Sequence, residues 1–79
     1  MLKLNEMTSG QTGIVRRIEG GKGMVRRLHA IGIREGKTVK KVSAQFWRGP
    51  VTIELEFRQF SIGNGMAGRI FVEPTEVQA

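Results

Sequence analysis

The fold class of this chain is decided by residues 51–58, VTIELEFR, in which apolar and polar residues alternate without a break. Successive side chains of a β-strand point to opposite faces of a sheet, so this period of two predicts a strand with one buried face and one wet face. The preceding Arg48-Gly49-Pro50 is typical of a turn. We therefore expect a half-buried strand from Val51 to Arg58.

Working outward, four further segments have strand-like composition and are separated by some of the 11 glycines. They are Gln11–Glu19, Thr38–Phe46, Phe60–Ile62 and Arg69–Glu73. In the second of these the apolar phase slips at Lys40-Lys41, where a β-bulge would bring Val39 and Val42 to the same side. Short strands between glycine-rich turns favour a small barrel or sandwich, and hence a mainly β fold.

One segment departs from this strand pattern. Its apolar residues recur at helical spacing, which predicts a helix over Gly23–Ile31. Gly32 follows directly and can take the left-handed conformation that ends many helices. Ile33 then occupies the position whose side chain packs back against Leu28 in such a cap.

With 79 residues the chain is expected to be one domain, spanning residues 1–79, with residues 75–79 frayed. A domain of this size has a thin core. The residues predicted to form it are Leu28, Ile31, Val39, Val42, Val51, Ile53, Leu55, Phe57, Ile70 and Val72.

The composition excludes most catalytic chemistry. The chain has no cysteine, no aspartate and a single histidine, so a nucleophile–base–orienter triad cannot be built. Glu54 and Glu56 share the wet face of the predicted strand, where a carboxylate pKa is not easily shifted. Gly20-Gly21-Lys22-Gly23 lacks the spacing of a phosphate-binding Walker loop and predicts a tight strand-to-helix turn. We expect neither an enzyme nor a cofactor.

The sequence also argues against an intrinsic metal site. A metal needs three or four converging ligands, and His29 has Val25 and Ile33 as its helical neighbours four residues away. We expect no tight site for ferrous iron, and a metal bound at His29 would be adventitious. No apolar run approaches the roughly 20 residues of a membrane-spanning helix, and the N-terminus has no signal-peptide pattern. The absence of cysteine fits a reducing cytoplasm.

The formal net charge is +6, which suggests an acidic partner, nucleic acid or an anionic membrane surface, or simply serves solubility. The candidate contact residues are Arg26 and Arg27 on the polar side of the helix, and Trp47 and Arg48 beside the turn. Arginine and tryptophan are enriched where proteins bind one another. The alternative is that the arginines are only solvated and that Trp47 closes one end of the barrel.

Several of these elements together resemble the FeoA family of ferrous iron transport. The resemblance rests on Ile18-Glu19-Gly20-Gly21, Arg27-Leu28, Ile31-Gly32-Ile33, Gly49-Pro50-Val51 and Ala67-Gly68-Arg69-Ile70-Phe71-Val72, in this order and spacing. It covers Leu4 to Glu73. Gly63-Asn64-Gly65 departs from the family pattern, which more often has helix-forming residues there.

This resemblance implies an SH3-like five-stranded barrel with one short helix inserted after the first strand. It also implies a cytoplasmic accessory protein that binds FeoB, the membrane GTPase transporter of ferrous iron. Two alternatives stay open: a small basic barrel that binds nucleic acid, or a stand-alone relative of the C-terminal domain of iron-dependent repressors. The first would require basic and aromatic residues gathered on one face.

Overall fold

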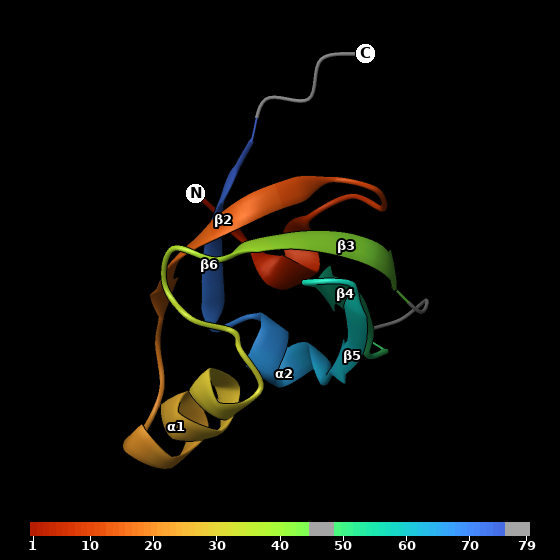
Figure 1. The fold of residues 1–79 in the computed structure, drawn as a ribbon. Coiled ribbons are helices and arrows are strands. Elements are labelled where there is room, and N and C mark those ends of the chain that lie inside the picture. Colours follow the sequence, from red (N-terminus) through yellow and green to blue (C-terminus); the bar gives the residue numbers. More distant parts are fainter. Residues whose placement is uncertain (45–48, 76–79) are drawn as a thin grey trace.

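The computed structural model describes residues 1–44 and 49–75. In chain order its elements are β1 (Leu2–Lys3), the 3-10 helix η1 (Leu4–Glu6), β2 (Thr12–Ile18), α1 (Lys22–Ala30), β3 (Thr38–Ala44), β4 (Val51–Leu55), β5 (Arg58–Ile62), α2 (Asn64–Ala67) and β6 (Ile70–Pro74). The strands form one antiparallel sheet in the order β1-β6-β2-β3-β4-β5. Figure 1 shows the sheet curling around η1, with α2 below it and α1 set apart at one end.

All five predicted strand regions are present, and a two-residue strand, β1, is added where Leu2 pairs with Val72 of β6. The short helix α2 forms in spite of the two glycines around Asn64. The Asn5 side chain donates a 3.2 Å hydrogen bond to Asn64 Oδ1 and so joins η1 to α2. No helix in the described part of the chain is long and apolar enough to span a membrane.

The predicted strand over residues 51–58 is wrong in its second half. Strand β4 ends at Leu55, and the chain reverses through the two-residue loop Glu56-Phe57 into β5. Both loop residues have positive φ angles, 52° and 67°. Phe57, predicted to be in the core, is instead 97% exposed because it forms the tip of this hairpin.

Helix α1 begins and ends one residue earlier than predicted. Gly32 has a φ of +101°, and the N–H of Gly32 and the N–H of Ile33 donate to the carbonyls of His29 and Leu28. These two bonds confirm the predicted glycine cap. Ile31 was predicted to be buried, but it lies beyond the helix end and is 37% exposed. Ile33 takes the inward position and is fully buried.

The bulge in β3 lies later than predicted. Lys41 pairs with Ile53 and Ser43 with Thr52, so Val42 is the extra residue. Val42, predicted for the core, is therefore only half-buried, and Lys41 keeps the inward face with a side chain that is 4% exposed. Its Nζ donates to the backbone carbonyl of Met7 and, at 3.3 Å, to that of Asn5. Desolvation by burial lowers the pKa of Lys41 below its ordinary value of 10.5.

The lowered pKa of Lys41 predicts a specific pH dependence. Between that pKa and 10.5 the unfolded chain binds more protons at this residue than the folded chain does, so this residue makes stability rise with pH. We expect the free energy of unfolding of the wild type, relative to Lys41→Met, to increase over this range in urea titrations. Lys40→Met is the matched control because it removes the same charge from an exposed position of β3. A difference that stays constant with pH would contradict the prediction.

The core lies between the curled sheet, η1 and α1. Seven predicted members are buried: Leu28, Val39, Val51, Ile53, Leu55, Ile70 and Val72. Six further residues join them: Leu4, Met7, Val15, Ile33, Ile62 and Ala67. The C-terminal segment predicted to fray lies outside the described residues except for Thr75, whose N–H donates to the Thr12 carbonyl at 3.1 Å.

Candidate functional site

One basic surface that the structure describes is built on α1. The helix starts after Gly21, whose extended backbone lets its carbonyl accept the first helical bond from the Val25 N–H at 3.0 Å. Leu28 anchors the helix in the core, whereas Arg26 and Arg27 are exposed. Lys22 adds a third cation in the first turn, where no acidic residue offsets the positive end of the helix dipole. The helix surface is therefore strongly electropositive.

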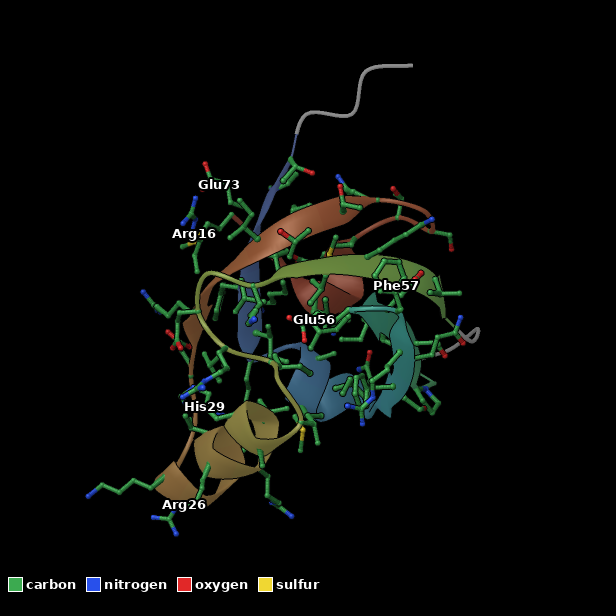
Figure 2. All side chains as sticks on the ribbon, in the orientation of Figure 1. Arg16, Arg26, His29, Glu56, Phe57 and Glu73 are labelled. Carbon is green, nitrogen blue, oxygen red and sulfur yellow. The ribbon has the colours of Figure 1, made fainter. Side chains whose placement is uncertain are left out.

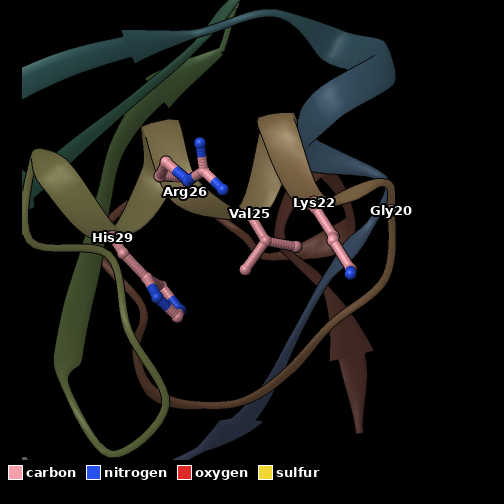
Figure 3. A pocket seen from close by; sticks show the side chains of 5 residues that line it. All are labelled: Gly20, Lys22, Val25, Arg26 and His29. Carbon is pink, nitrogen blue, oxygen red and sulfur yellow. The ribbon is translucent and has the colours of Figure 1, made fainter.

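Beside α1 lies an open pocket of about 360 Å³, lined by Gly20, Lys22, Val25, Arg26 and His29. Figure 3 shows Lys22, Val25 and His29 projecting from one side of the helix into it, while the Arg26 guanidinium points the other way in this view. Lys22, Val25 and His29 share a face because residues three, four and seven apart line one side of a helix.

The structure places Glu35 beside His29, a pairing that helical spacing cannot indicate. His29 Nε2 lies 3.3 Å from Glu35 Oε1, close enough for an ion pair when the imidazole is protonated. The contact does not have hydrogen-bond geometry, so Nε2 is buried without a hydrogen-bond partner among the described residues. In the described part of the chain, no three His, Cys, Asp or Glu side chains converge to hold a metal ion. The predicted absence of an iron site stays a prediction.

The structure describes two of the four predicted contact residues. Arg26 and Arg27 lie side by side in sequence on the exposed side of α1, and neither forms an ion pair with a carboxylate in the described ranges. Trp47 and Arg48 lie outside the described residues. Their role as contact residues therefore stays a prediction. So does the alternative that Trp47 closes one end of the barrel.

The two arginines of β2, unlike the pair on α1, are compensated by neighbouring groups. Arg16 Nε lies 2.8 Å from Glu73 Oε1, and Figure 2 shows the two side chains together on the sheet. Arg17 forms an ion pair with Glu19 and also lies over the Phe71 ring, 5.2 Å from its centre. Both are therefore less available to an acidic partner than the α1 arginines.

The sequence reasoning missed one exposed feature, Phe57 at the tip of the β4–β5 hairpin. A signal was present, because the apolar residues change phase between Phe57 and Phe60. A change from odd to even positions is what a chain reversal at residues 56–57 produces.

Comparison with known proteins gives the family. The model of the FeoA domain matches residues 2–74. A Methanocaldococcus jannaschii protein named "Putative Fe(2+) transport protein A" is 37% identical over 67 residues, which cover 85% of this chain and 79% of that protein. A crystal structure described as an iron uptake regulatory protein, FeoA, is 34% identical with a TM-score of 0.87, covering 94% of this chain and 97% of the other.

A more distant structure bears on the fold. The Stenotrophomonas maltophilia FeoA, crystallised with zinc and described as an SH3 domain protein, is similar with a TM-score of 0.78 at 21% identity, over 92% of this chain and 91% of that one. This similarity confirms the predicted mainly β, SH3-like fold. The family model and the curated relative go further, and they show that the chain belongs to the FeoA family.

Proposed function

We propose that this chain is a cytoplasmic, non-enzymatic accessory protein of ferrous iron uptake that binds the cytoplasmic part of a FeoB-type transporter. The observation that carries the proposal is the pair Arg26 and Arg27 on an exposed, electropositive helix of an FeoA-family chain. A guanidinium can hold a carboxylate through two parallel hydrogen bonds. Two such groups without a described carboxylate partner suit an acidic patch on another protein.

Nucleic acid is a less suitable partner for this surface. Binding of single strands combines a basic groove with aromatic side chains on which bases stack. None of the described aromatic residues lies on α1: Phe60 and Phe71 are in strands, and Phe57 is in the loop between β4 and β5. Two of their rings are already covered by arginines of the same chain, Arg58 and Arg17.

The test is a calorimetric titration of the wild type and variants against the soluble domain of the transporter. Arg26→Gln with Arg27→Gln should weaken binding by about tenfold or more, because the pair would lose charge-assisted hydrogen bonds to the partner. Trp47→Ala, tested separately, should also weaken binding. Circular dichroism should stay native, since both arginines are exposed.

The control is Arg16→Gln with Arg17→Gln, which removes the same net charge from an adjacent arginine pair on β2. It should bind within about threefold of the wild type, with the residual loss due to long-range electrostatic attraction. Equal losses in the two double variants would mean that bulk charge, and not the α1 surface, drives binding. A wild type that binds neither the soluble domain nor the full-length transporter in membranes would refute the proposed function.

A further inference from the structure

The β4–β5 hairpin tip presents an aromatic ring directly to solvent. Phe57 is 97% exposed, and Figure 2 shows it beside the strands, right of centre, away from Arg26 at the lower left. A single exposed apolar residue is ordinary on a protein surface and needs no explanation by itself. The backbone that carries this ring makes it informative.

Phe57 stands where a two-residue hairpin normally has glycine. Both loop residues have positive φ, the geometry in which Asn-Gly or Gly-Gly is strongly preferred, whereas here the loop is Glu56-Phe57. Bulky residues rarely take this conformation because the Cβ atom crowds the backbone. The ring gains no burial in return, so the fold of the isolated chain does not account for phenylalanine at this position.

The surrounding contacts hold the tip in one geometry. Leu55 pairs with Arg58 across the base of the loop. Lys37 Nζ donates a 2.8 Å hydrogen bond to Glu56 Oε2, and this bond and the Lys37 charge lower the pKa of Glu56, so that the carboxylate stays ionised. The Arg58 guanidinium lies 5.4 Å from the centre of the Phe60 ring. A hairpin whose backbone is held before binding loses little conformational freedom when the ring that it carries is captured.

We infer that Phe57 is an apolar anchor that inserts into a hydrophobic pocket of a protein partner. This inference rests on the proposed function and takes the cytoplasmic part of the transporter as that partner. Arg58, the next residue along the chain, is exposed and suits a carboxylate at the pocket rim. The Phe57 anchor is a second surface, distinct from the α1 arginines.

A protein pocket fits better than a lipid surface. Glu56 precedes the ring and is exposed and paired with Lys37, so insertion would carry both charged groups towards the apolar layer, where burying charge is costly. A single ring would also give only weak membrane affinity, since even a whole myristoyl chain binds a protein to a membrane only marginally. In a protein pocket one desolvated aromatic side chain can supply much of the binding energy.

The experiment measures binding and stability on the same variants. Phe57→Gly should weaken binding to the transporter's soluble domain by about tenfold to a hundredfold, the effect of burying one phenyl ring. The same variant should melt at a higher temperature, because glycine relieves the left-handed backbone. Phe57→Asn, which also tolerates this backbone, should behave similarly, whereas Phe57→Tyr keeps a ring and should bind within about threefold of the wild type.

The outcomes separate this inference from the proposed function. If the wild type binds and Phe57→Gly binds equally well, the anchor is refuted and the function stands. If the wild type does not bind, both the Phe57 anchor and the proposed function are refuted. A lower melting temperature for Phe57→Gly would refute the strain argument. Ring-dependent sedimentation with phosphatidylglycerol–phosphatidylethanolamine vesicles, or a ring-dependent dimer in solution, would overturn the assignment of the anchor to the transporter.

Discussion

Leu55→Ala is expected to lower the free energy of unfolding by about 2–5 kcal/mol. The side chain is 3% exposed and belongs to the hydrophobic core at the end of β4. Its removal loses apolar burial and leaves a cavity that a close-packed interior fills only in part. Because domains are stable by only about 5–15 kcal/mol, the loss is a large share of the total. Thermal melting should shift down by at least about 8 °C.

The matched control for this core substitution is Phe57→Ala. The sequence pattern places Phe57 on the same face as Leu55, two residues further along, but the structure exposes it almost completely. Phe57→Ala should therefore leave the melting temperature within about 2 °C of the wild type or raise it slightly. If both variants were equally destabilised, the hairpin at residues 56–57 would be wrong. A melting curve unchanged by Leu55→Ala would remove Leu55 from the core.

The core strands could be predicted because their pattern has a direct physical cause. Val51, Ile53 and Leu55 alternate because one face of β4 covers the interior, and all three are buried. The end of that strand was missed, because period-two alternation runs on to Phe57 and the loop lacks the usual asparagine or glycine. Only the change of apolar phase between Phe57 and Phe60 indicates the reversal. Hairpin pairing of β4 with β5 overrode the local preference of Phe57 for extended backbone.

The buried face of β3 was harder to predict. The position of a β-bulge decides which residues point inwards, and the composition of the strand does not reveal that position. Placing the bulge at Val42 instead of Lys40-Lys41 turns Lys41 inwards. No hydrophobicity pattern assigns a lysine to a core. Its burial depends on two carbonyls, of Asn5 and Met7, which the N-terminal segment supplies from about 35 residues away in sequence. Hydrogen bonds between residues so far apart in sequence can be recognised only in the folded structure.

The candidate site was partly predictable for the same reasons. Helical periodicity places Arg26 and Arg27 away from the face of the buried Leu28, and both are exposed. The proximity of Glu35 to His29 depends on the path of the chain after Gly32, which no helical spacing describes. The Phe57 anchor could not be inferred from the sequence, because the inference depends on the positive φ angles of the loop. A sequence indicates such angles mainly where it has glycine or asparagine.

Gly32→Val should have the second largest effect, lowering the free energy of unfolding by about 2–4 kcal/mol. The backbone φ of +101° disfavours any side chain and a β-branched one most. A Cβ atom at this position would also lie 3.0 Å from Leu55 Cδ2, so the core would have to shift. Chemical denaturation of the variant measures the sum of these two penalties.

A matched pair of alanine substitutions separates the backbone penalty from the packing penalty. Gly36 has a similar φ of +94°, but a Cβ atom there would have no neighbour within 4 Å. Gly36→Ala should therefore report backbone strain alone, about 1–2 kcal/mol, and Gly32→Ala should cost more. In the Leu55→Ala background the extra cost at Gly32 should disappear, because the atom that the new Cβ would meet is gone. Equal costs at the two glycines, or no coupling between residues 32 and 55, would show that the helix cap does not pack tightly against β4.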